Sequence, residues 1–540
     1  MKSFFRWPFY PILFALYPIV YLAGHNLSII SPADPLRPMI ISIMSAVFLL
    51  FYFKIVIKDW HRSALLDLLV LILFFSFGHV ANQVSIVSQE IMAWIWLGVF
   101  LGLAFLITKL QNVESLTFSM NVVSVGLIIL SFFPIAKLFV WRIQVKLNTD
   151  FSSSLLAEMR NEQQSEKDAF FSAESPDIYY IILDSYEGGG ALQRYYHFDN
   201  SDFIHGLQDR GFFVASESRS NYLTTTYSLS SALNLVYIND LPYGLFTEMI
   251  SGMHINHVVD FLHDRGYEYV HFPSGYLLTD DATPDVWVSP NLLENQSPIL
   301  RPSISEFEVL LLQTSLGRLV IQPYLDEHEE ARPQGSAVLN QDFNNRRTRL
   351  KNAFLHLPDY VSNPQKSFIF AHMILPHNPY LYDAYGNPYE YNGRNELLGD
   401  QNDSQNNIRL YTDQLQYTNV QILDTIDRIL KNAKTPPIII IQADHGHDTF
   451  FDFEAPTPEG IDLRSSILSA MYFPGGDYSR LYPTITPVNT FRVVLNQFFN
   501  TNYPLLPDRS YLHPRRPPNS LTSKQQFSPI DPYLDQLPQQ

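Results

Sequence analysis

Two acidic residues and a histidine stand directly after apolar, strand-like runs in the second half of the chain. Asp184 follows DIYYIIL, and Asp444 and His445 follow PPIIIIQ after one alanine. Carboxylate and imidazole groups at neighbouring strand ends make a ligand set that suits Zn or Mn, with Mg or Ca as further options. An aspartate after one strand is often only a turn residue, but His447 adds a third potential ligand within the four residues DHGH. We therefore predict a divalent metal site.

Three consecutive threonines offer this site a candidate nucleophile. They stand in SNYLTTTYSLSSALN, residues 220–234, at the start of a helix-like segment. The free amides of a helix N-terminus favour an anion, and a metal can withdraw the proton that makes a threonine hydroxyl a poor nucleophile. Such a sequence is commonly only a helix cap. The prediction of a threonine nucleophile therefore depends on whether this segment lies close to Asp184 and Asp444.

Two further histidines flank a strand end in AHMILPHNPY. Pro376 and Pro379 stiffen the chain around His377, so that we expect its side chain to point into the site. His372 lies within the apolar run that precedes it. The alternative reading, two ordinary loop histidines, stays open on these residues alone.

Strand-like runs alternate with helical segments after residue 175. We expect strands at 177–183, 212–216, 267–272, 367–375, 436–442 and 467–473, and helices at 202–210, 227–234, 255–265, 407–432 and from 487 onward. This alternation predicts an α/β domain with a mostly parallel central sheet and helices on both faces. Ligands of such sheets bind beyond the carboxyl ends of the strands, where Asp184 and Asp444 stand.

The charge of the 540-residue chain is divided unevenly. The formal net charge is -17, with +5 in residues 1–147 and -22 in the rest. This acidic balance argues against nucleic acid as a partner, because nucleic-acid binders need a basic surface. The chain has no cysteine, which excludes disulfides and thiolate chemistry.

Five apolar runs predict an N-terminal region of five transmembrane helices. They cover residues 7–23, 38–57, 64–80, 91–107 and 116–141, and each can cross about 30 Å of hydrocarbon. Lysine and arginine gather before the first run, between the second and third, and between the fourth and fifth. The positive-inside rule then places the N-terminus in the cytoplasm and the chain after the fifth run outside. We expect a multi-pass protein of the plasma (inner) membrane.

Composition divides the chain into four segments. We expect a membrane domain at 1–147, a polar stalk or linker at 148–174, one extracytoplasmic domain at 175–512, and a tail rich in proline and glutamine at 513–540. The tail is expected to be disordered.

The order of these pieces resembles the alkaline phosphatase superfamily, in particular its membrane-anchored, sulfatase-like branch of lipoteichoic acid synthases and phosphoethanolamine transferases. The resemblance spans residues 176–511. Its carriers are PDIYYIILDSY, FDNSDFIHGLQDRGFFVASESRSNYLTTTYSLSSALN, HMILPHNPY, PPIIIIQADHG, and ILSAMYFPGG with ITPVNTFRVVLNQFF. It implies a sulfatase-like α/β catalytic domain behind a multi-span membrane anchor.

The resemblance also implies roles for single residues. Asp184 becomes the first metal ligand and Asp444 with His445 the later pair. Thr225 becomes the nucleophile and a metal contact, because the family places a serine three residues later and Ser228 fits only Thr225. His377 contacts the transferred group or its leaving oxygen, and His372 is a weaker candidate for the same role. His447 is an extra ligand or only a neighbour.

The predicted function is a metal-dependent transfer of a phospho-alcohol group, of the phosphoglycerol or phosphoethanolamine type. The donor is a membrane lipid, the acceptor a component of the cell envelope, and Thr225 the carrier. One alternative is a hydrolase of sulfate or phosphate esters, although the C/S-x-P-x-R sequence of true sulfatases is absent near Thr225. A second alternative is a membrane scaffold with an inactive outer domain.

Overall fold

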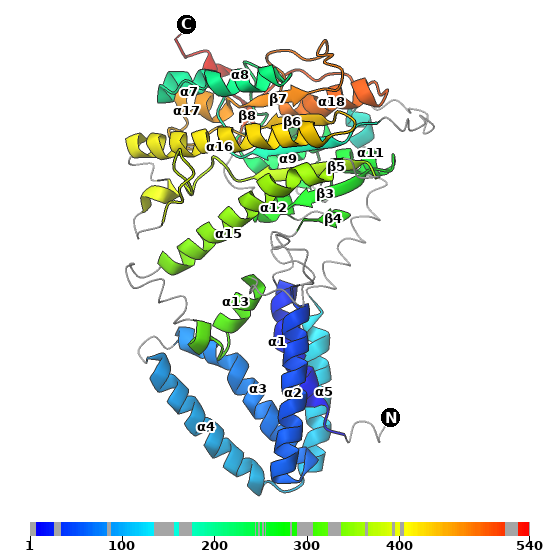
Figure 1. Ribbon diagram of the computed structural model, residues 1–540, viewed down its shortest axis with the longest axis vertical. Helices are drawn as coiled ribbons and strands as arrows, with labels where there is room; N and C mark the ends of the chain where they lie inside the picture. Colours follow the sequence, from blue (N-terminus) through cyan, green and yellow to red (C-terminus); the bar gives the residue numbers. More distant parts are fainter. Residues whose placement is uncertain are drawn as a thin grey trace. The chain divides into compact units, whose positions relative to one another are not determined.

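A computed structural model of the protein divides its chain into two compact units (Figure 1). The first consists of Met1–Asn148 and Glu294–Arg332, and the second of Thr149–Leu293 and Pro333–Gln540. The structure describes residues 7–25, 34–83, 88–133, 156–160, 175–242, 245–246, 249–250, 253, 255–280, 283–288, 306–321, 336–361, 365–390, 395–399, 404–513 and 527–538.

The first unit is built from apolar helices. These are α1 (Tyr10–His25), α2 (Leu36–Ile57), α3 (Trp60–Gln83), α4 (Gln89–Lys109) and α5 (Val113–Ser131). Within the described residues, α2, α3, α4 and α5 are long and apolar enough to cross a membrane. The expectation of five such helices is corrected to four, because α1 has 16 residues and spans only about 24 Å. The last part of the fifth predicted run, 134–141, lies outside the described residues.

A segment from later in the sequence belongs to this first unit. α13 (Glu306–Gln313) buries Phe307 against Ile19 and Ala23 of α1. The sequence analysis assigns Glu294–Arg332 to the outer domain, and the structure differs. The physical reason is that the apolar side of α13 is buried against membrane helices.

A seven-stranded sheet forms the centre of the second unit (Figure 1). Its strands are β1 (Ile178–Leu183), β2 (Phe213–Val214), β3 (Glu268–Phe272), β4 (Val286–Trp287), β5 (Ser367–Met373), β6 (Ile438–Gln442) and β7 (Ser469–Tyr472). The order is β2-β7-β6-β1-β5-β3-β4, and only β7 runs antiparallel to its neighbours. The predicted mostly parallel sheet is confirmed.

Helices cover both faces of this sheet. Side chains of β1 alternate between two cores, as the period of two in a strand requires. One face carries α7 (Gly189–Tyr196), α8 (Ser201–Asp209), α15 (Ser336–His356) and α16 (Ser404–Asn432); the other carries α9 (Thr225–Asn234), α11 (His257–His263) and α18 (Pro487–Phe498). Because β1, β5 and β6 are buried on both sides, their sequences are almost continuously apolar.

The remaining described elements are short, and some lie in the C-terminal tail. They are η2 (Ile238–Asp240), α12 (Leu277–Asp280), η3 (Leu357–Tyr360), η4 (Asn395–Leu398), α17 (Pro458–Ser465), β8 (Tyr511–Leu512), β9 (Ser528–Pro529) and α19 (Asp531–Leu534). β9 pairs with β8, and Ile530 is buried beside Leu223. This part of the tail is ordered, in contrast to the expected disorder, because its SPIDPYL sequence packs into a hydrophobic cluster.

Candidate metal and nucleophile site

The residues that follow three parallel strands meet at one edge of the sheet. In the register of β1, Ile182 lies opposite His372 of β5 and Gln442 of β6. Asp184 and Asp444 each follow two residues later. Because parallel strands end at the same edge, the two aspartates come together beside His372, although about 260 residues separate them in the chain.

Asp184, His372 and Asp444 form a buried group that could hold a metal ion. One potential ligand atom from each lies within 4.8 Å of the others. The closest contact joins Asp184 Oδ2 and His372 Nε2 at 3.3 Å. Among the described residues, Nε2 of His372 and Oδ2 of Asp444 are buried without a hydrogen-bond partner. Buried polar atoms of this kind cost free energy unless something pairs with them, so the donor set fits a divalent cation.

A hydrogen bond behind His372 orients its ring. Thr279 Oγ1 lies 3.1 Å from Nδ1 of His372 and 3.1 Å from the carbonyl of Tyr276. Nε2 faces the Asp184 carboxylate at 3.3 Å, and an unprotonated Nε2 repels that carboxylate. Burial lowers the pKa of His372, but the nearby Asp184 carboxylate outweighs it and raises that pKa. Either a proton on Nε2 or a cation between the two groups removes the repulsion.

Asp184 stays ionised despite its burial. Burial raises the pKa of this carboxyl, but His377, His372 and His445 outweigh it, and the pKa lies well below its ordinary value. A carboxylate that is charged at any physiological pH is available as a metal ligand.

His445 presents a second lone pair to the same place. Nη2 of Arg464 lies 3.2 Å from His445 Nε2, and a guanidinium can only donate, so Nε2 is an acceptor. The other nitrogen, Nδ1, donates to the carbonyl of Gly446 at 3.0 Å. Nε2 lies 3.5 Å from Asp444 Oδ2 and 3.2 Å from Thr225 Oγ1. His445 is therefore oriented toward the aspartates and the candidate nucleophile together.

Only one of the three threonines reaches this group. Thr225 is the first residue of α9, is 7% exposed, and contacts His445. The hydroxyls of Thr224 and Thr226 have other partners, each at 3.4 Å: the side chains of His513 and Tyr276, respectively. The geometry thus separates Thr225 from its neighbours, which the sequence could do only through the family pattern.

His377 lies beside the ligand group and outside it. Its N–H donates to the Asp184 carbonyl at 3.1 Å, and its ring centre is 6.5 Å from that of His445. His377 is half-buried. It can therefore touch a molecule that reaches Thr225 without being bound to the metal.

Of the two alternatives for His447, an extra ligand or only a neighbour, its contacts favour the second. Its Nδ1 accepts from, or donates to, the Tyr196 hydroxyl at 2.9 Å, and its Nε2 lies 3.1 Å from the Tyr380 hydroxyl. The ring packs 4.1 Å from that of Tyr411, centre to centre. Burial lowers the pKa of His447 to about 3. With both nitrogens engaged by tyrosines, His447 is a buried packing residue and not a ligand of this group.

Sequence reasoning missed Arg464 of α17. Its guanidinium donates to the carbonyls of Leu223 at 3.0 Å and Gly446 at 2.9 Å, besides contacting His445. It therefore ties the loop before Thr225 to the DHGH loop. No motif marks Arg464, because it stands about 20 residues beyond DHGH in an unremarkable polar helix. Only its burial and its partners reveal the role.

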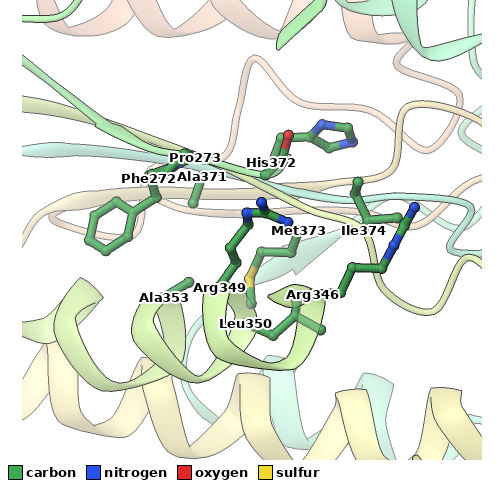
Figure 2. Close-up of a pocket in the computed structure, with 11 residues that line it drawn as sticks. Phe272, Pro273, Arg346, Arg349, Leu350, Ala353, Ala371, His372, Met373 and Ile374 are labelled. Atoms are coloured by element: carbon green, nitrogen blue, oxygen red, sulfur yellow. The ribbon is translucent and has the colours of Figure 1, made fainter. Parts of the chain in front are cut away.

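A small pocket beside His372 is not the substrate site. It is formed by the end of β5, the chain after β3, and α15 (Figure 2). Figure 2 shows Arg346 and Arg349 approaching the strand end from α15, whereas the ring of His372 points away from that helix. Its volume of about 10 Å³ is room for about one water molecule.

Comparisons with known proteins give only low similarity. No family model matches the chain. No curated protein matches it either. Among solved structures, the C-terminal periplasmic domain of EcEptC from Escherichia coli is similar with a TM-score of 0.40 at 12% identity, over 69% of this chain and 97% of that one.

Two further solved structures are similar at the same level. The integral membrane lipooligosaccharide phosphoethanolamine transferase A (EptA) from Neisseria meningitidis has a TM-score of 0.38 at 12% identity, over 90% of this chain and 95% of that one. The phosphonate monoester hydrolase of Agrobacterium radiobacter has a TM-score of 0.39 at 12% identity, over 63% and 80%. At these values, the case for an activity has to come from the side chains of the site.

Proposed function

We propose that the protein is a metal-dependent transferase that moves a phospho-alcohol group from a membrane lipid to an envelope acceptor through Thr225. The observation that carries this proposal is the position of one hydroxyl. Thr225 Oγ1 lies 3.2 Å from His445 Nε2, beside the buried group of Asp184, His372 and Asp444. A hydroxyl next to a cation site at a helix N-terminus is equipped for nucleophilic attack on phosphorus.

Asp184, Asp444 and His445 would hold the cation with the Thr225 hydroxyl, and we include His372 in this set because a potential ligand atom of it lies within 4.8 Å of those of Asp184 and Asp444. The mixed oxygen and nitrogen donors fit Zn or Mn. When bound, such an ion lowers the pKa of a hydroxyl and neutralises charge on a phosphoryl oxygen.

The chain's own residues supply the rest of the site. The Thr225 hydroxyl releases its proton to water, its oxygen forms a bond to phosphorus, and the bond from phosphorus to the lipid's alcohol oxygen breaks, which leaves a phospho-threonine ester and a diacylglycerol-type alcohol. The amides of the first turn of α9 face the developing oxyanion. His377 contacts the leaving oxygen and gives it a proton. An acceptor hydroxyl then takes the group from Thr225.

The first unit suits a substrate that is itself in the membrane. Four of its described helices are long and apolar enough to span a bilayer. Lys54, Lys58 and Arg62 lie around the connection from α2 to α3, and Lys109 lies at the end of α4. By the positive-inside rule these two connections are cytoplasmic, so the four spanning helices alone place the second unit on the extracytoplasmic side of the plasma (inner) membrane. The donor is therefore a lipid of that membrane and the acceptor an envelope component.

Labelled lipids and the mass of one peptide test the proposal. The full chain is reconstituted with phosphatidylethanolamine or phosphatidylglycerol labelled in the headgroup. The mass of the peptide around Thr225 is then measured by mass spectrometry. We expect a headgroup phosphate adduct on Thr225 in the wild type and in Thr226→Ala, a matched control next to it. Thr225→Ala loses both adduct and transfer. Unchanged transfer by Thr225→Ala overturns the assignment, and release of free headgroup phosphate without any acceptor favours the hydrolase.

A further inference from the structure

A large groove runs among the helices of the first unit. Its volume is about 470 Å³, and α1, α2, α3 and α13 line it. α2 contributes Ile41, Ser45 and Leu49, and α3 contributes Leu71 and Phe75. All of its lining residues belong to the first unit, whereas Thr225 belongs to the second.

The walls of the groove determine what can occupy it. α2 and α3 are both among the helices that can cross a membrane, and Ile41 on the wall of α2 is 56% exposed. Surface of this kind faces hydrocarbon in a bilayer, where a water-filled apolar groove is unfavourable. A flexible hydrocarbon chain is therefore the occupant that these walls fit.

The groove also has one charged position at its rim. Arg37, the second residue of α2, forms a two-pronged ion pair with Glu308 of α13, through Nε at 2.6 Å and through Nη2. Arg37 is near the end of a spanning helix, where the hydrocarbon meets the headgroups. A guanidinium binds a phosphate in the same two-pronged geometry as a carboxylate, so the phosphate of a lipid can take the place of the Glu308 carboxylate on Arg37.

Close backbone contact fixes the wall that α13 provides. A Cβ at Gly78 of α3 would lie 2.3 Å from the carbonyl oxygen of Gln313, so only glycine permits this approach. Leu316 N–H donates to the carbonyl of Phe74 at 2.7 Å. Backbone contacts of α3 with Gln313 and with Leu316 therefore fix this wall of the groove.

We propose that this groove binds an acyl chain of a glycerophospholipid whose phosphate lies at Arg37. That this lipid is the donor of the transfer rests on the proposed function. Binding itself depends only on the apolar walls of the groove and the charge at its rim.

Photo-crosslinking with a chain-labelled lipid tests the groove. The full protein is placed in nanodiscs of phosphatidylethanolamine and phosphatidylglycerol that contain an analogue with a diazirine in one acyl chain. We expect adducts on the groove residues of α3 in preference to the exposed face of α4. Ser45→Trp fills the groove and lowers these adducts at least about fivefold. Met44→Trp, its neighbour outside the lining, leaves them unchanged. Equal labelling of α4, or no effect of Ser45→Trp, overturns the proposal.

Two variants at the rim separate phosphate binding from a purely structural ion pair. Arg37→Gln removes a charge-assisted bond and is expected to lower the groove adducts about tenfold. Glu308→Gln leaves the guanidinium in place, so the adducts persist or increase. A purely structural pair makes both variants equally disruptive, and that result overturns the role of Arg37. Groove adducts in a wild-type protein that shows no transfer count against the proposed function and not against the groove.

Discussion

Each of the two units contains buried aspartates, but the polar groups around these aspartates differ. In the second unit, Asp184 is surrounded by three histidines and lies within 4.8 Å of a second buried carboxylate. In the first unit, Asp67 of α3 is fully buried, and neither of its oxygens has a hydrogen-bond partner among the described residues. Burial alone therefore does not mark a chemical site; converging ligand atoms do.

The contrast follows from where each architecture places its polar side chains. A parallel sheet brings the ends of distant strands to one edge, so polar residues there gather without disturbing the core. A membrane-spanning helix pairs its own backbone N–H and C=O groups, so a polar side chain within it needs a hydrogen-bond partner on another helix. Within the described part of the chain, Asp67 has no hydrogen-bond partner, whereas Asn121 of α5 accepts from Tyr10 N–H at 3.0 Å.

The largest effect is expected from Asp444→Ala. It removes one of the two carboxylates from the buried group of Asp184, His372 and Asp444, so metal affinity should fall by more than about a hundredfold and transfer with it. Metal content after dialysis, measured by mass spectrometry, and transfer of labelled headgroup are the readouts. Asp67→Asn is the matched control, and it should keep a stoichiometric ion. Retention of the ion by Asp444→Ala contradicts the assigned site.

Arg464→Gln should lower kcat by about 10-fold to 100-fold while the metal stays bound. The variant removes the bridge between the carbonyls of Leu223 and Gly446, so that Thr225 and His445 are less well placed. A purely structural role would lower thermal stability without a selective loss of kcat. Arg428→Gln, at an exposed ion pair on α16, is the control and should behave as wild type.

Glu187→Gln should change the pH dependence of stability more than the activity. Burial raises the pKa of the Glu187 carboxyl well above its ordinary 4.5, so the folded protein keeps a proton that the unfolded chain releases. Stability is therefore lost as pH rises from about 4.5 to the folded pKa, by about 1.4 kcal/mol per pH unit. The variant should remove that slope in denaturation midpoints measured from pH 5 upward. Parallel slopes in both proteins contradict the prediction.

The strands that carry the site residues were predictable, because the apolar pattern of a strand is a local property of the sequence. DIYYIIL and PPIIIIQ are almost continuously apolar; the first is followed directly by Asp184 and the second by Asp444 after one alanine. Partners that depend on tertiary approach were not predictable. The tyrosines around His447 come from three separate elements, and Arg464 is marked by no pattern. The assignment of α13 to the first unit was missed because EFEVLLLQ suits a soluble helix equally well.

The smallest effect is expected from Asp67→Asn, and it tests the comparison most directly. The amide has nearly the same shape as the carboxyl and cannot ionise, and the carboxyl has no hydrogen bond to lose among the described residues. Unfolding free energy should therefore change by less than about 1 kcal/mol, with metal content and transfer unchanged. Thermal unfolding in detergent and the transfer assay measure both. A loss of transfer greater than tenfold means that an ionisable group inside the helical unit takes part in the chemistry. In that case burial without visible partners is itself a sign of function, and the contrast between the two units fails.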